Sequence, residues 1–199
     1  MRSVKLCRML RGKHPRLDPF VPTSWDMVGR IIDFAELSED SVMVDLGSGD
    51  GRLVFEAAER YGCASIGVEL DQSLVEYARQ KAEALRLKNV AFINRDVRRI
   101  NLSKATHITA YLTSRALKQI ENILLTAPPN AIIVTHNYPI PSWRPTEVAE
   151  TRSSSDGKIH VLYKYVPKMS APARLEDRIQ RMGAGSLDGA LRYLTMRLL

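Results

Sequence analysis

An eight-residue stretch, VDLGSGDG at positions 44–51, constrains the fold more than any other part of the sequence. The apolar residues around Val44 are typical of a short buried strand, and the residues from Arg52 to Tyr61 have the pattern of a helix. The glycines between them lack Cβ atoms, so the backbone can turn sharply and approach a ligand. Because open α/β sheets bind ligands at the carboxyl ends of their strands, the stretch predicts a ligand site at this turn.

The residues beside the glycines narrow the class of ligand. A dinucleotide fingerprint would place a third glycine where this chain has Arg52, and a P-loop would end in Gly-Lys-Ser/Thr, which does not occur here. Asp45 and Asp50 would repel a pyrophosphate. Acidic groups in these positions suit a ligand that carries an amine and a sulfonium.

The rest of the chain alternates strand-like and helix-like segments. Strands are expected near residues 42–46, 65–70, 90–93, 107–112 and 131–134, and helices near 25–36, 52–61, 73–85 and 117–124. The two helices with the clearest caps are expected to begin after Ser24, with Met27, Val28, Ile31, Ile32 and Ala35 inward, and at Ser73, with Leu74, Tyr77, Ala78, Ala82 and Leu85 inward. Residues 147–152 and 160–166 are expected to form a closing hairpin. This order predicts an α/β fold with a mostly parallel sheet and an antiparallel edge.

Length and charge suggest one domain with basic ends. The chain has 199 residues and a net charge of +7, of which +5 falls in residues 1–20 and +3 in residues 168–199. The basic ends could attract an acidic protein or a nucleic acid, and the leucines at 187, 191, 194 and 198 have helical spacing. Two cysteines exclude a disulfide framework, and no apolar run is long enough to span a bilayer. A cytoplasmic protein is therefore expected.

Two acidic residues extend the pattern of the glycine turn. Glu69 ends the expected second strand, and Asp96 follows the third. Together with VDLGSGDG they resemble the motifs of class I S-adenosylmethionine (SAM)-dependent methyltransferases. The resemblance implies a Rossmann-like single domain with a seven-stranded, mostly parallel sheet and a C-terminal antiparallel hairpin. That domain would cover residues 20–167, between a basic arm at 1–19 and a basic extension at 168–199.

A narrower resemblance rests on three further segments: FVPTS at 20–24, LTS at 112–114 and THNYPIPSW at 135–143. They resemble the protein-lysine methyltransferases that include archaeal broad-specificity enzymes and the mitochondrial enzymes modifying the ATP synthase c subunit or the adenine nucleotide translocase. The family implies a protein substrate that presents a lysine.

The resemblance also implies roles for individual residues. Pro22 and Thr23 would fold over SAM from the N-terminal side. The turn residues Asp45, Gly47, Ser48, Gly49, Asp50 and Gly51 would line its methionine part, Glu69 and Leu70 its ribose, and Asp96 and Val97 its adenine. Thr113, Tyr138 and Trp143 would lie near the methyl-transfer mouth. No metal is expected, and His136 is expected to be structural rather than a base.

The implied chemistry is an in-line attack by a lysine amine on the sulfonium methyl group. Alignment of the two reactants can supply on the order of 7–11 kcal/mol. Walls formed by Tyr138 and Trp143 would desolvate the ammonium and favour the neutral amine, so no dedicated base is required.

Three alternatives stay open at this level. A nucleic-acid methyltransferase acting on base amines would carry Asn/Asp-Pro-Pro-aromatic after the fourth strand, where this chain has Leu112-Thr113-Ser114; ribose and ring-carbon targets in RNA are compatible with that sequence. A small-molecule methyltransferase or a non-catalytic SAM-binding module would also contain the glycine turn. The sequence does not indicate the oligomeric state.

Overall fold

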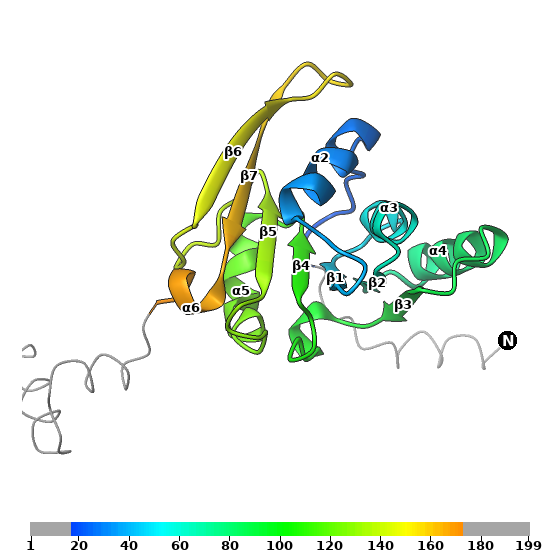
Figure 1. The fold of residues 1–199 in the computed structure, drawn as a ribbon, viewed down its shortest axis with the longest axis horizontal. Coiled ribbons are helices and arrows are strands. Elements are labelled where there is room, and N and C mark those ends of the chain that lie inside the picture. The colour runs from blue at the N-terminus through cyan, green and yellow to red at the C-terminus, as the bar shows by residue number, and fades with distance from the viewer. Residues whose placement is uncertain (1–16, 173–199) are drawn as a thin grey trace, which may run out of the picture.

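The computed structural model describes residues 17–172 as one α/β domain built on a seven-stranded sheet. In Figure 1 the strands follow one another across the molecule, and their order in the sheet is β3-β2-β1-β4-β5-β7-β6. The strands are β1 (Val42–Leu46), β2 (Ala64–Glu69), β3 (Val90–Asn94), β4 (His107–Ala110), β5 (Ile132–His136), β6 (Glu147–Arg152) and β7 (Ile159–Tyr165). Strands β1 to β5 are parallel, and the β6–β7 hairpin adds the antiparallel edge. The predicted seven-stranded fold is therefore confirmed.

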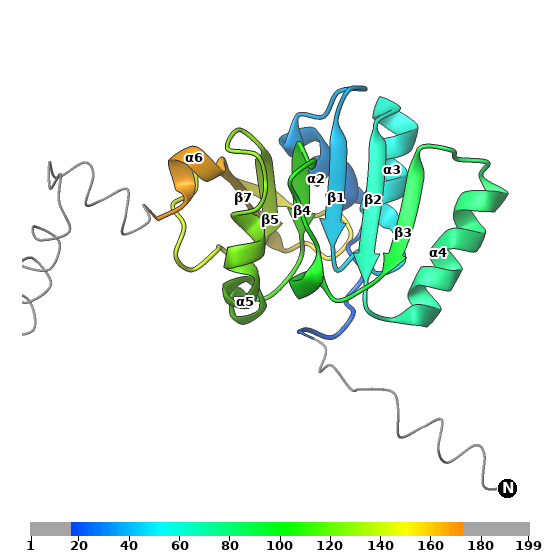
Figure 2. The ribbon, with the colours of Figure 1, turned by 90° about the horizontal axis from the view of Figure 1, so that it is seen from below.

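Helices cover both faces of the sheet and give it two apolar layers. Helices α2 (Trp25–Ala35), α3 (Arg52–Tyr61) and α4 (Gln72–Ala84) pack on one face, and α5 (Ser114–Leu124) covers the other (Figure 2). A 3₁₀ turn, η1 (Val97–Arg99), and the short helix α6 (Pro167–Ser170) complete the described elements. The described part of the chain contains no helix that combines the length and the apolar character needed to cross a membrane.

The strand order fixes where a ligand can bind. The chain runs outward from β1 through β2 to β3, then returns to the other side of β1 as β4. The loops after β1 and β4 therefore diverge to opposite faces of the sheet and leave a crevice between the carboxyl ends of these strands. VDLGSGDG leads into this crevice, because β1 ends at Leu46 and α3 begins at Arg52.

The predicted apolar face of α2 is confirmed, whereas that of α4 is partly wrong. Tyr77 and Leu85 are exposed, and the residues that α4 buries are Val75, Ala78 and Ala82. Apolar side chains occupy two adjacent stripes of this helix, and only its docking on the sheet decides which stripe is buried. Its cap is Asp71, whose side chain accepts a hydrogen bond from the Ser73 amide.

Ser24 occupies the predicted cap position of α2, but its side chain makes no capping hydrogen bond. The fourth strand ends at Ala110, two residues earlier than expected, because Thr113 already caps α5. The expected helix around Leu187 to Leu198 lies outside the described residues.

Trp143 is part of the core and not of an open channel, so its predicted place at the methyl-transfer mouth is wrong. Its side chain is 6% exposed and packs edge-on against the buried Tyr165 ring, with 6.3 Å between ring centroids. Tyr165 in turn accepts a hydrogen bond from the Ile140 amide at its hydroxyl. The Pro-rich segment after β5 therefore folds back on the sheet and carries the indole inward.

Truncating this indole is expected to cost stability. Trp143→Ala should lower the free energy of unfolding by about 3–5 kcal/mol, as for other large-to-small core substitutions. Urea denaturation measures the change. Tyr138→Ala, at a side chain that is 39% exposed, is the control and should change it by less than about 1 kcal/mol. Similar losses in the two variants would contradict the buried position of Trp143.

Candidate functional site

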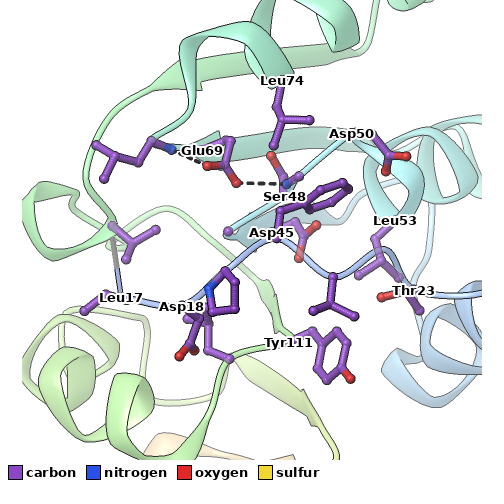
Figure 3. A pocket seen from close by; sticks show the side chains of 18 of the residues that line it. Leu17, Asp18, Thr23, Asp45, Ser48, Asp50, Leu53, Glu69, Leu74 and Tyr111 are labelled. Atoms are coloured by element: carbon purple, nitrogen blue, oxygen red, sulfur yellow. Dashed lines mark hydrogen bonds between the residues drawn. The ribbon is translucent and has the colours of Figure 1, made fainter. Parts of the chain in front are cut away.

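The crevice holds a pocket that is closed on one side by an N-terminal strap, residues 17–23. Figure 3 shows this pocket between the strap, the glycine turn and the ends of β2 and β4. The predicted cofactor residues that line it are Thr23, Asp45, Gly47, Ser48, Gly49, Asp50, Glu69, Leu70, Asp96 and Val97. Pro22 and Gly51 do not line it, although each adjoins a residue that does.

The glycine turn leaves space for the strap. Gly49 has a φ of +55°, a backbone conformation that side chains rarely adopt. A Cβ atom on Gly49 would collide with the ring of Phe20 in the strap. Gly51, with a φ of +87°, begins α3, and a Cβ there would lie 2.7 Å from the Phe92 ring. Gly49 thus brings the strap against the loop, and Gly51 seats α3 against β3.

Asp45 is a carboxylate inside the sheet. Its side chain is buried and accepts a 2.7 Å hydrogen bond from the Thr109 hydroxyl on the neighbouring strand β4. Burial raises the pKa of Asp45 to about 7, with a smaller contribution from the nearby carboxylates of Glu69 and Asp50. A cation entering the pocket would favour the charged form of Asp45 and be held by it.

Glu69 organises the opposite wall through backbone amides. One carboxylate oxygen accepts a 3.0 Å hydrogen bond from the Gly49 amide, and the other accepts from the amides of Leu70 and Asp71 (Figure 3). These contacts use three of the roughly four acceptor directions of a carboxylate. The side chain is therefore fixed at the carboxyl end of β2, beside the glycine turn.

The Asp96 carboxylate forms an ion pair with the neighbouring Arg98. It accepts hydrogen bonds from the Arg98 amide and guanidinium, with separations of 2.5–3.0 Å. This pair begins η1 and leaves the buried Val97 side chain against the core. The pocket wall at η1 therefore combines the apolar Val97 side chain with the Asp96 carboxylate, whose charge Arg98 balances.

The strap is tied at both ends. Asp18 accepts two hydrogen bonds from Thr113, 2.7 Å from the amide and 2.8 Å from the hydroxyl. At the other end, the Thr23 carbonyl accepts a bond from Arg52, whose guanidinium also pairs with Asp50. Since Leu17, Asp18 and Pro19 all line the pocket, the expected domain boundary at residue 20 falls inside the strap.

Thr113 has a structural position in this arrangement. Its hydroxyl donates to Asp18 and accepts a 3.3 Å bond from the Ala116 amide at the start of α5. It does not line the pocket. Its hydroxyl is bonded to the strap and to the first turn of α5.

Asp18 and Tyr111 are among the pocket residues that sequence reasoning missed. The Asp18–Thr113 contact joins residues 95 positions apart, and no local motif signals it. Tyr111 follows β4 directly, and its ring lies 6.5 Å from that of Tyr138, the predicted aromatic residue. The position of Tyr111 at the carboxyl end of an inner parallel strand is a signal that the sequence did contain.

Comparisons with known proteins agree with this geometry. Residues 45–147 match the family model described as the ANTKMT methyltransferase domain. A protein-lysine N-methyltransferase of Saccharolobus islandicus is 30% identical over 152 residues, which cover 74% of this chain and 92% of that protein. The chain belongs to the ANTKMT methyltransferase family.

Two other relatives extend the comparison. A lysine N-methyltransferase of Xenopus laevis, named for the ATP synthase c subunit, is 29% identical over 65% of this chain, which spans 58% of that protein. The crystal structure of an RNA methyltransferase from Salinibacter ruber, in complex with S-adenosyl-L-homocysteine, is 30% identical with a TM-score of 0.70. It matches 78% of this chain and 99% of its own.

S-adenosylmethionine is the cofactor of this methyltransferase, and the pocket fits it. Asp45 and Asp50 could offer carboxylates to its ammonium and sulfonium groups, beside the close approach that the glycine turn allows. Glu69, at the end of β2, would accept hydrogen bonds from the ribose hydroxyls through its remaining acceptor capacity. Leu70 and Val97 line the pocket and could offer apolar surface to the adenine.

The raised pKa of Asp45 makes cofactor affinity depend on pH. The positive groups of SAM would bind the ionised carboxylate more tightly, and the free enzyme loses that form as pH falls below about 7. The dissociation constant for SAM, measured by isothermal titration calorimetry between pH 5 and 7.5, should rise by up to about tenfold per unit below pH 7. Asp45→Asn should bind weakly, with a flat profile in this range. A flat profile in the unaltered protein would contradict the raised pKa.

The strap is expected to retain the cofactor. Asp18→Ala removes two hydrogen bonds and should raise the dissociation constant for SAM about tenfold, at about 0.5–1.5 kcal/mol per bond. Calorimetry at pH 7.5 measures this, with the exposed Asp40→Ala as the control. Unchanged affinity in Asp18→Ala would mean that the strap does not restrain the cofactor.

Proposed function

We propose that the protein transfers a methyl group from SAM to the side-chain amine of a lysine in a protein substrate. The observation that carries this proposal is the charge of the pocket. Five carboxylates line it, from Asp18, Asp45, Asp50, Glu69 and Asp96, and the two lining arginines pair with only two of them, Arg52 with Asp50 and Arg98 with Asp96, so an excess of carboxylates is left. Such a lining attracts a cationic side chain and repels a phosphate backbone.

The names of the relatives support a protein acceptor, with one exception. The Saccharolobus and Xenopus proteins are both named as lysine N-methyltransferases, whereas the Salinibacter structure is named as an RNA methyltransferase. Two guanidinium groups reach the pocket, and each is paired with a carboxylate, Arg52 with Asp50 and Arg98 with Asp96. Neither arginine is thus an isolated charge that would draw a nucleic-acid backbone into the site.

The strand ends also disfavour a base amine as acceptor. Asn/Asp-Pro-Pro-aromatic, the motif associated with exocyclic base amines, is absent after β4, where the chain reads Tyr111-Leu112-Thr113-Ser114. Instead, Tyr111 and Tyr138 form an aromatic surface at the ends of β4 and β5. Aromatic faces attract ammonium groups and the positive charge that develops on an attacking nitrogen.

The chain's own residues position the acceptor and lower the cost of deprotonating it. Bound SAM supplies the methyl group on a sulfonium, which is a good leaving group. A lysine with an unperturbed pKa near 10.4 requires about 4.6 kcal/mol to lose its proton at pH 7. Tyr111 is half-buried and lines the pocket, so its ring would desolvate the ammonium and reduce this cost.

Two further expectations stay predictions. The protein is proposed to act in the cytoplasm, and the basic ends, residues 1–19 and 168–199, are proposed to help it dock its substrate.

Label transfer tests the acceptor class. The protein is incubated with lysate and SAM that carries a radioactive methyl group, and parallel samples are digested with protease or nuclease. Loss of macromolecular label with protease and its recovery as methyl-lysine are expected. Asp45→Asn, which is expected to bind SAM weakly, should reduce the label about tenfold or more.

Label that is lost with nuclease would overturn the proposal in favour of a nucleic-acid acceptor. A small-molecule acceptor or a module without catalysis would give no macromolecular label despite normal SAM binding.

A further inference from the structure

The outer side of the strap is apolar and adjoins exposed rings on α2 and α4. Phe20 and Val21 are 42% and 56% exposed, although both also line the cofactor pocket. Trp25, the first residue of α2, and Tyr77 of α4 are each 53% exposed. Tyr77 lies three residues after Leu74, which lines the pocket as well. These residues, Phe20, Val21, Trp25 and Tyr77, form an apolar rim beside the pocket.

Two cations flank the exposed indole of Trp25. The Arg52 guanidinium and the Lys81 ammonium each lie 5.2 Å from the centroid of the Trp25 ring, and Lys81 lies 4.6 Å from that of Phe55. Arg52 begins α3, and Lys81 follows Tyr77 by one turn of α4, so these contacts join three helices that stand in a row in Figure 1. Trp25 is thus held in place before a partner binds, which lowers the entropy cost of binding.

The two cations differ in their other partners. Arg52 pairs with Asp50 and donates a hydrogen bond to the Thr23 carbonyl. Lys81 forms no ion pair with a carboxylate of residues 17–172, and its ammonium contacts only aromatic rings there. Its positive charge is therefore available to an acidic group of a partner.

The charge beside the rim is opposite to the charge of the pocket. Five carboxylates line the pocket, and its arginines pair with only two of them. Outside it, Lys81 is positive, and residues 1–20, which lead into the strap, have a net charge of +5. A nucleic acid or an anionic lipid surface carries one sign of charge and would be repelled by the pocket. A protein segment that carries a lysine and an acidic residue complements both regions.

The composition of the rim is also that of a protein-binding surface. Single exposed apolar side chains are common on soluble proteins, whereas adjoining ones mark an interaction site. Trp, Tyr and Arg are the residues whose removal most often weakens a protein interface. Trp25, Tyr77 and Arg52 bring these three residue types together beside the pocket.

We propose that the apolar rim and Lys81 dock a segment of the protein substrate that carries an acidic and an apolar side chain near the target lysine. The acid would lie against Lys81 and the apolar side chain on Trp25, while the lysine enters the pocket at Tyr111. Docking of this kind rests on the proposed function, because it concerns the same protein substrate. It adds which residues around the lysine the enzyme selects.

Methylation kinetics test the docking surface with the acceptor protein purified from the labelled lysate. Trp25→Ala and Lys81→Glu should each raise KM for the acceptor about tenfold or more, the effect expected of a central interface residue. The change should fall on KM and not on kcat, since neither residue lines the pocket. Calorimetry should show unchanged SAM affinity in both variants, which excludes general unfolding.

The matched controls lie elsewhere on the same two helices. Tyr61→Ala removes the ring of another cation–π pair, with Arg60 at the end of α3. Lys88→Glu makes the same charge change as Lys81→Glu at an exposed lysine after α4. Both controls should keep KM within about twofold of the unaltered protein. Equal increases in the controls would reduce the effect to general charge or lost stability and overturn the docking surface.

Fluorescence measures the docking directly, because the chain has two tryptophans. Trp25 is exposed and Trp143 is buried, so a partner on the rim alters the emission of Trp25. With S-adenosyl-L-homocysteine present, the acceptor should shift the emission of the unaltered protein, and Trp25→Phe should show no shift. An unshifted emission in the unaltered protein, at acceptor concentrations above KM, would contradict docking on the rim.

Variants of the acceptor test the predicted acid. Each Asp or Glu near the methylated lysine is replaced by its amide. One replacement should raise KM about tenfold with the unaltered enzyme and leave KM unchanged with Lys81→Glu, because groups in contact have non-additive effects. Purely additive increases, or an acceptor in which no acid matters, would overturn the proposed chemistry of the partner.

Other occupants of the rim give different results. Vesicles of phosphatidylserine and phosphatidylcholine that shift the Trp25 emission would identify a lipid-binding surface and overturn the proposal. A dimer that Trp25→Ala dissociates, measured by light scattering, would identify a second copy of the chain and overturn it as well. Label lost with nuclease would instead overturn the proposed function, and the docking with it. Methyl-lysine with unchanged KM in Trp25→Ala and Lys81→Glu would leave that function intact and overturn only the docking surface.

Discussion

The buried carboxylate of Asp45 is the interaction on which the site depends. The parallel register of β1 and β4 sets Asp45 opposite Thr109, and the Thr109 hydroxyl is its hydrogen-bond donor. A charged group at this depth is costly without a partner, and its pKa is raised to about 7 as a result. A cationic ligand relieves this cost, so the free energy that destabilises the empty carboxylate contributes to cofactor binding.

The rest of the pocket is arranged around that charge. Glu69 holds the Gly49 amide, and Gly49 leaves room for Phe20 of the strap. The strap is in turn fastened to the cap of α5 through Asp18 and Thr113. The strap is therefore connected to the end of β4, because Thr113 follows this strand two residues after Tyr111.

The antiparallel hairpin does more than close the sheet. Its turn is anchored on α2, where Asp26 accepts hydrogen bonds from Ser154 and Ser155. The same hairpin places His160 against His136 at the end of β5. An edge that the sequence shows only as a strand pair thus brings a second imidazole and an acid next to the end of β5.

The sequence by itself determined the fold and the cofactor end of the site. Strand and helix periods, the glycine turn, and acids at the ends of successive strands are local features, and parallel strands bring their carboxyl ends to one edge. The tertiary structure alone decided the surroundings of Trp143, Thr113 and Tyr111. The Trp143 ring packs against Tyr165, the Thr113 hydroxyl donates a hydrogen bond to Asp18, and the Tyr111 ring packs on His136. Each of these contacts joins residues that are distant in the sequence. No local pattern encodes which of several aromatic or polar side chains after a strand will face the pocket, since packing against other elements makes that choice.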